Sequence, residues 1–186
     1  MKRFFPLFML ALALFALVTV SSNARADAPA PDKDGYINTG SGVRTKTVAI
    51  ITANVYSIRH DMKGPLPARN KRAVIDADVD KKFSWQMMRD VDSDKIQNAL
   101  KEGFAKNGYS DGGKVGRFVG AFTKEIQKNQ GVSISYNAAS KTTTIWVQGQ
   151  GSASIDGVDF MKAVWSIWFG NIDQPSLGDN LISRIP

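Results

Sequence analysis

Residues 42–47, Gly-Val-Arg-Thr-Lys-Thr, and residues 165–170, Trp-Ser-Ile-Trp-Phe-Gly, carry most of the information about the fold. The first stretch places Arg44 just before a long apolar run, residues 48–55. The second closes a segment, residues 158–169, whose apolar side chains would cover most of the circumference of a helix. Such a helix is buried or lines a cavity. We therefore expect a strand over residues 48–55 with both faces largely buried, and a buried helix over residues 158–169.

The segments between these two stretches predict a mixture of helices and strands. A helix is expected to start at residues 92–94, Asp-Ser-Asp, where acidic and hydroxyl side chains suit a helix N-terminus, and to stop near Gly108. An apolar stripe at helical spacing predicts a second helix over residues 115–126. Residues 132–136 and 142–147 are expected to pair as a hairpin. Because helices and strands do not alternate strictly, the pattern favours an α+β fold.

The N-terminal 26 residues have the features of a signal peptide. Lys2 and Arg3 precede an apolar run, residues 4–20, and Ala24-Arg25-Ala26 supplies a cleavage site of small residues. We expect a periplasmic or secreted protein, with an uncleaved anchor as the alternative. Residues 27–35 are expected to be a disordered leader and residues 36–186 one domain. No later segment approaches the ~20 apolar residues of a membrane span, so none is expected after cleavage.

The composition argues against a nucleic-acid partner and against disulfide bonds. The chain carries 24 basic and 17 acidic residues, a net charge of +7. Removal of residues 1–26 takes away three basic residues and no acidic one, which leaves 21 − 17 = +4. This charge is mild, and no basic-aromatic repeat is present, so we expect no nucleic-acid partner. Cysteine is absent, so the folded chain must be held together by its core without disulfides.

Metal and nucleophile chemistry find little support. A zinc site of the usual Cys/His kind is excluded, because His60 is the single histidine. No G-x-S-x-G elbow accompanies it, and we interpret His60 as a surface residue. Asp76, Asp78 and Asp80 alternate along the chain, which is more typical of a solvated edge than of a cation site. We expect no metal and no cofactor.

Arg44 is the strongest candidate for ligand binding. It begins a run otherwise nearly free of charge, and its planar guanidinium suits carboxylate or phenolate oxygens. The partner is either a ligand or a carboxylate of the protein itself. For a ligand site we expect the guanidinium to be unpaired or only weakly paired and to line an apolar pocket.

Three features together resemble the chalcone isomerase-like family. Gly42-Val43-Arg44 precedes an apolar strand that ends at Val55-Tyr56, and the segments 94–108 and 155–170 are similar to later segments of that family. The resemblance spans about residues 36–184. It implies an open-faced antiparallel sheet with helices packed on one side. The family includes plant isomerases, fatty-acid-binding relatives and non-catalytic relatives. The resemblance also implies that Arg44 contacts the oxyanion of a ligand.

The catalytic residues of the isomerases are not carried over. The same alignment places Asp92 where the isomerases have their catalytic tyrosine, and Ala99 where they have an active-site asparagine. Thr52 is a candidate match for a strand threonine. The resemblance therefore implies binding of a small amphipathic acid, of fatty-acid or phenolic type, in a cleft containing Arg44. The candidate ligand-binding residues are Arg44, Thr52, Tyr56, Trp165 and Trp168, although core packing is favoured for the two tryptophans.

Two alternatives remain open at this stage. The first is an isomerase of the intramolecular lyase type, for which Tyr56 is the nearest candidate for a general base. The second is a protein-interaction module without a small ligand, whose cleft would be filled by its own side chains. The sequence does not identify a protein partner.

Overall fold

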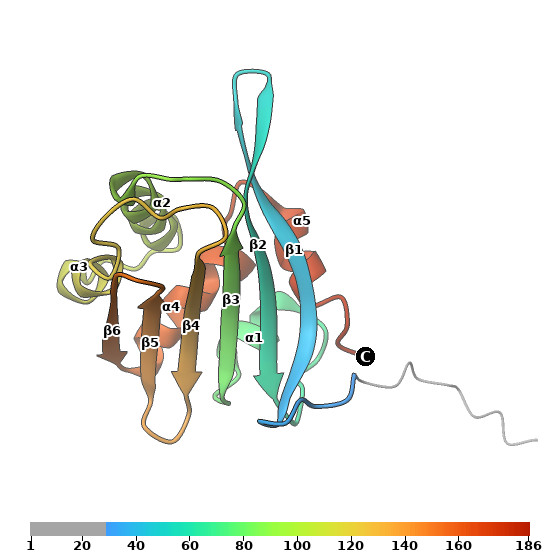
Figure 1. Ribbon diagram of the computed structural model, residues 1–186. Coiled ribbons are helices and arrows are strands. Elements are labelled where there is room, and N and C mark those ends of the chain that lie inside the picture. Colours follow the sequence, from blue (N-terminus) through green and yellow to red (C-terminus); the bar gives the residue numbers. More distant parts are fainter. Residues whose placement is uncertain (1–28) are drawn as a thin grey trace, which may run out of the picture.

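A computed structural model describes residues 29–186 as a six-stranded antiparallel sheet with helices packed against one face (Figure 1). The strands follow one another in chain order across the sheet, β1-β2-β3-β4-β5-β6. The strands are β1 (Tyr36–Val48), β2 (Ile51–Lys63), β3 (Lys81–Met87), β4 (Gly131–Asn137), β5 (Thr142–Val147) and β6 (Gly151–Asp156). The helices are α1 (Lys71–Asp76), α2 (Ser93–Lys106), α3 (Gly112–Val119), α4 (Val158–Phe169) and α5 (Pro175–Leu181). The predicted fold class, an open-faced α+β sheet, is confirmed.

The expected signal peptide and the first two residues of the expected leader lie outside the described residues. Within residues 29–186, no helix is long and apolar enough to cross a membrane.

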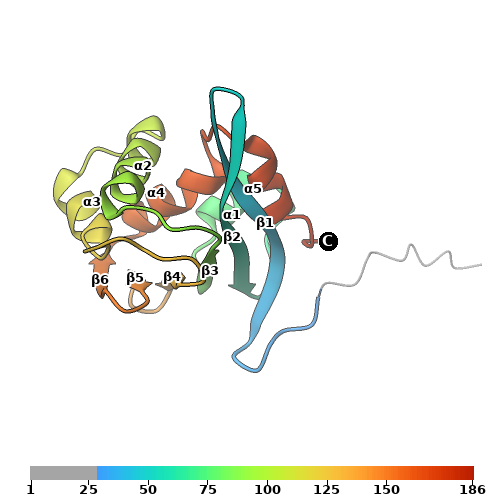
Figure 2. The same ribbon diagram turned by 45° about the horizontal axis from the view of Figure 1, so that its top comes forward.

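Alternation of side chains along the strands explains why only one face of the sheet is covered. On β3, Phe83, Trp85 and Met87 point into the core, while Ser84 and Gln86 point away from it. The same period of two recurs on β4 and β5. The helices lie on the apolar face (Figure 2), and the opposite face, rich in serine and threonine, stays open.

The predicted helix over residues 158–169 is confirmed as α4, which packs behind the sheet (Figure 1). Trp165 and Trp168 are both almost completely buried. The interpretation of His60 as a surface residue is wrong, because this side chain is fully buried on β2. Its Nε2 accepts from the indole of Trp165 at 2.8 Å, and its Nδ1 lies 2.6 Å from the hydroxyl of Thr39. Core burial lowers the pKa of His60 well below its ordinary value, so the ring is neutral.

The predicted helix near residues 92–108 is confirmed as α2, and Gly108 follows it with a positive φ of 78°. The prediction of one helix over residues 115–126 is only half right. α3 ends at Val119, and Gly120 is its C-terminal cap. Ile126 is buried all the same, and its backbone pairs with that of Val91 through an isolated β-bridge. The apolar stripe therefore correctly identified core residues, but the chain leaves the helix between them.

The prediction of a buried strand over residues 48–55 is wrong. These residues form the tip of the β1–β2 hairpin, which projects beyond the rest of the sheet (Figure 1). Ile50 and Ile51 are 96% and 72% exposed. Arg44 consequently lies within β1, opposite Tyr56 of β2 in the register of the ladder. The sheet register thus brings two candidate site residues together.

The alternating aspartates do not form a metal site. Asp76 pairs with Arg72 and Lys162, Asp78 accepts from the hydroxyl of Tyr136, and Asp80 pairs with Lys63. Residues 29–186 contain no group of three or more His, Cys, Asp or Glu side chains placed to hold a metal ion.

Candidate functional site

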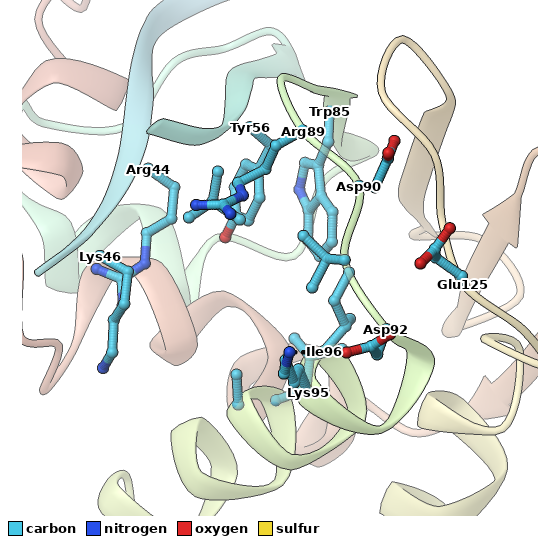
Figure 3. A pocket seen from close by; sticks show the side chains of 14 residues that line it. Arg44, Lys46, Tyr56, Trp85, Arg89, Asp90, Asp92, Lys95, Ile96 and Glu125 are labelled. Carbon is cyan, nitrogen blue, oxygen red and sulfur yellow. Dashed lines mark ion pairs between the residues drawn. The ribbon is translucent and has the colours of Figure 1, made fainter. Parts of the chain in front are cut away.

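A cavity of about 580 Å³ lies beside the stem of the β1–β2 hairpin, between the sheet and α2 (Figure 3). Arg44 and Lys46 of β1 and Val55 and Tyr56 of β2 form its wall on the hairpin side. Trp85 of β3 and the segment between β3 and α2 continue this wall. The first turns of α2 form the opposite wall. The lining residues after Tyr56 are Trp85, Arg89, Asp90, Val91, Asp92, Lys95, Ile96, Ala99, Leu100 and Glu125.

The sheet side of the cavity is aromatic. Tyr56 and Trp85 stack with their ring centres 4.6 Å apart and their planes 7° from parallel. Behind them, the indole of Trp168 donates to the hydroxyl oxygen of Tyr56 at 3.1 Å. Burial raises the pKa of Tyr56, although the nearby indole of Trp168 and the charge of Arg44 act in the opposite direction. The phenol therefore stays protonated at neutral pH, and its oxygen already serves as an acceptor.

The charges around the cavity are unevenly distributed. Arg44, Lys46 and Arg89 lie at one end, and Asp90 and Glu125 lie at the other (Figure 3). An anionic group entering the cavity is attracted to the cationic end and repelled from the acidic end.

On the α2 side of the cavity, the charges of Lys95 and Asp92 balance each other, because the two side chains form an ion pair at 2.7 Å.

The expectation that the guanidinium of Arg44 is unpaired or only weakly paired is wrong. Its Nη2 lies 2.5 Å from a carboxylate oxygen of Asp173, and its Nη1 donates to the side-chain oxygen of Gln174 at 3.3 Å. Lys46 contacts the other oxygen of Asp173 at 3.1 Å. Although burial acts to raise the pKa of Asp173, the hydrogen bonds from Arg44 and Lys46 hold it below its ordinary value. Arg44 thus borders the cavity with its charge largely balanced by a neighbouring carboxylate.

The structure brings only part of the predicted set to the cavity. Arg44 and Tyr56 line it directly, and Trp168 lies immediately behind Tyr56. Thr52 is instead on the projecting hairpin, where its hydroxyl bonds to that of Thr47 at 2.8 Å. Trp165 lies in the core against His60. Neither Thr52 nor Trp165 lines the cavity.

The two positions that correspond to isomerase catalytic residues both border the cavity. Asp92 and Ala99 are among its lining residues. The alignment of α2 with the family therefore pointed to the surface that borders this cavity, which carries a paired carboxylate and a methyl group in place of a tyrosine and an asparagine.

Among the lining residues that sequence reasoning missed are Trp85 and Arg89. Trp85 belongs to the alternating pattern of a strand, which by itself signals only a core position. Arg89 stands in the short connection between β3 and α2, next to Asp90. An arginine between a buried strand and a helix start was the available signal.

The chain belongs to the chalcone isomerase-like family, because residues 27–178 match the model of that family. Among solved structures, it is similar to the crystal structure of a fatty-acid binding protein from Arabidopsis thaliana, with a TM-score of 0.65 and 18% sequence identity. The alignment covers 84% of this chain and 91% of the plant chain. At this identity the likeness establishes the fold alone. A search of curated proteins finds no match.

Proposed function

We propose that this protein binds a small amphipathic acid, of fatty-acid or phenolic type, in the cavity between the β1–β2 hairpin stem and α2. The observation that carries the proposal is the cavity itself, which combines an aromatic wall with a cluster of cationic side chains at one end. The acid group would lie at the cationic end. The apolar part would lie between the Tyr56–Trp85 pair and the α2 side chains Ile96, Ala99 and Leu100.

The size and lining of the cavity suit such a ligand. Small-molecule sites commonly occupy ~300–1,000 Å³ and combine apolar walls with a few placed polar groups. Charge-assisted hydrogen bonds from guanidinium groups are about twice as strong as neutral ones, so an ionised acid gains more than an alcohol of the same length. The structural likeness to a plant fatty-acid binding protein supports the same ligand class.

The isomerase alternative receives less support. A general base needs a pKa near the working pH, whereas burial raises the pKa of Tyr56. Asp92 and Ala99 stand at the positions of the two isomerase side chains, and Ala99 offers no donor. The interaction-module alternative requires a cleft filled by its own side chains, and a cavity of about 580 Å³ does not support that condition.

We also propose that the protein is exported to the periplasm or secreted, on the strength of the signal-like residues 1–26. Sequencing the N-terminus of the protein recovered from the cells that make it tests this. A first residue of Asp27 supports export with cleavage. A retained Met1 would contradict cleavage.

Isothermal titration calorimetry with dodecanoate, and with dodecan-1-ol as the neutral analogue, tests the binding proposal. Dodecanoate is expected to bind, and to bind more tightly than the alcohol. Ala99→Phe should block the cavity, whereas Ala105→Phe is a matched control because this alanine is also exposed on α2 but does not line the cavity. Equal binding by both variants would place the ligand elsewhere, and absence of dodecanoate binding by the unaltered protein would refute the proposal.

A further inference from the structure

The indole N–H of Trp85 is a buried hydrogen-bond donor without an acceptor. The side chain is only 4% exposed, and its Nε1 has no hydrogen-bond partner among the described residues. In this part of the chain the buried hydroxyl of Thr143 also lacks a hydrogen bond, and the buried Oδ1 of Asp76 has only its ion pair with Lys162, but neither residue lines the cavity. An unsatisfied buried donor is costly, so native structures seldom retain one without a reason. A ligand oxygen would supply the missing acceptor.

The other three tryptophans each have a hydrogen-bond partner or access to water for their indole N–H. Trp165 donates to His60, and Trp168 donates to Tyr56. Trp146 is 47% exposed on the open face of the sheet, where water is available. Of the tryptophans, only Trp85 combines burial, an unused donor and a place in the cavity wall.

Arg89 supplies an available charge beside this donor. Within residues 29–186 no carboxylate lies within ion-pair distance of its guanidinium, in contrast to Arg44, which is bound to Asp173. In the view of Figure 3 the guanidinium of Arg89 lies between Arg44 and Trp85, and the indole nitrogen of Trp85 is on the side of its ring that faces Arg89 and Tyr56. Because the Tyr56 oxygen accepts from Trp168, its own hydrogen remains free to donate.

From these observations we infer that Arg89, the indole N–H of Trp85 and the hydroxyl of Tyr56 form the subsite that holds the ligand's carboxylate, and that Arg44 is a secondary contributor. This inference rests on the proposed function. It assigns the anchor of the ligand, by which we mean the side chains that bind its carboxylate. An ionised carboxylate has two oxygens and about four acceptor positions, which suits one charged donor and two neutral ones. A ligand without two such oxygens leaves at least one donor unsatisfied.

The subsite explains how the cavity selects an acid head group. Donors of a rigid aromatic pair do not rotate away when the ligand leaves, so little order is lost on binding. The exposed Arg89 side chain adds the charge, while Asp90 and Glu125 disfavour the reverse orientation. Arg44 would act chiefly by pairing with Asp173, which keeps the negative charge of that carboxylate balanced near the ligand.

The test compares dodecanoate affinity by calorimetry in four single variants of the full chain. Trp85→Phe keeps the aromatic stack and removes the N–H, and Arg89→Gln removes the charge. Each should weaken binding by about tenfold or more, since each loses a hydrogen bond to a charged group. Arg44→Gln should weaken it by less than about threefold, because Asp173 already balances that charge. Arg69→Gln changes another exposed arginine that does not line the cavity; it is the matched control and should leave the affinity unchanged.

A spectroscopic readout guards against variants that fail to fold. In the unaltered protein, dodecanoate should move the indole proton resonance of Trp85 downfield and leave that of Trp146 in place. If dodecanoate binds while the Trp85 resonance stays fixed, and Arg44→Gln loses more affinity than Arg89→Gln, the anchor is wrong although the proposed function stands. If the unaltered protein does not bind dodecanoate at all, the proposed function fails, and the anchor assignment fails with it.

Discussion

Replacing Trp165 by alanine tests how the core of this disulfide-free chain is held together. The side chain is completely buried, stacks on Phe83 with centres 5.1 Å apart, and lies beneath the ammonium of Lys81 at 4.9 Å. Its indole also begins a hydrogen-bonded chain through His60 to Thr39, whose hydroxyl donates to the backbone oxygen of Leu181. This chain connects α4, β2, β1 and α5.

The expected loss has two sources. Removing a buried tryptophan side chain costs about 3–5 kcal/mol of stability through lost contacts and the cavity left behind. Leaving Nε2 of His60 without a donor costs up to roughly 1–3 kcal/mol more. The two overlap, so we expect a loss of about 4 kcal/mol or more. A domain of this size has about 5–15 kcal/mol of stability, and the melting temperature should fall by roughly 8–16 °C.

Urea denaturation followed by far-ultraviolet circular dichroism measures this loss, with Trp146→Ala as the control. Trp146 is 47% exposed, so the same change there should alter stability by less than about 0.5 kcal/mol. Trp165→Phe should fall between the two, because it keeps most of the packing and removes only the N–H. Reasoning from burial would be refuted if Trp165→Ala unfolded at the same urea concentration as Trp146→Ala.

Three further predictions concern charge and chemistry. Asp173→Asn removes the carboxylate that balances the charge of Arg44, so the affinity for dodecanoate should rise by about twofold to tenfold while the affinity for dodecan-1-ol stays constant. Calorimetry measures both affinities, and equal changes for the two ligands would contradict this prediction. Burial lowers the pKa of Lys81 from 10.5 to about 7, so the unfolded chain binds more protons between these values and stability should rise with pH from about 7 to 9.5; a Lys81→Met variant that keeps the same slope in urea titrations would count against this. No chalcone cyclisation above the spontaneous rate is expected in an absorbance assay, because two isomerase positions hold an aspartate and an alanine; turnover abolished by Arg44→Ala would overturn this.

Sequence periodicity identified the parts of the fold that depend on local pattern. The α4 helix and the β4–β5 hairpin agree with their predicted bounds within a residue because their apolar spacing is regular. The β1 strand was not foreseen, since Gly40, Gly42 and several hydroxyl residues interrupt any apolar alternation. Its turn at Ala49 and Ile50 carries no Gly or Asn, although Ala49 has a positive φ of 53°. Without a turn residue to mark the hairpin, the sequence pattern alone cannot distinguish an apolar run at a hairpin tip from a buried strand.

The site was less predictable than the fold for a physical reason. Arg44 and Tyr56 stood out because they flank the same run of sequence, and the sheet register does bring them together. Whether an arginine is already paired depends on a distant residue, here Asp173, which no local pattern reveals. The unused donor of Trp85 is likewise a property of tertiary packing. Arg89 can therefore be identified as the arginine available to a ligand only when the ion pair of Arg44 is known.

The most direct test of the account is a crystal structure of the full protein grown with dodecanoate. The account predicts the alkyl chain between the Tyr56–Trp85 pair and α2, with carboxylate oxygens within hydrogen-bond distance, about 2.7–3.2 Å, of Trp85 Nε1 and the Arg89 guanidinium. A carboxylate bound to Arg44 alone would contradict the anchor. Dodecanoate bound outside the cavity, or at its acidic end beside Asp90 and Glu125, would contradict the account as a whole.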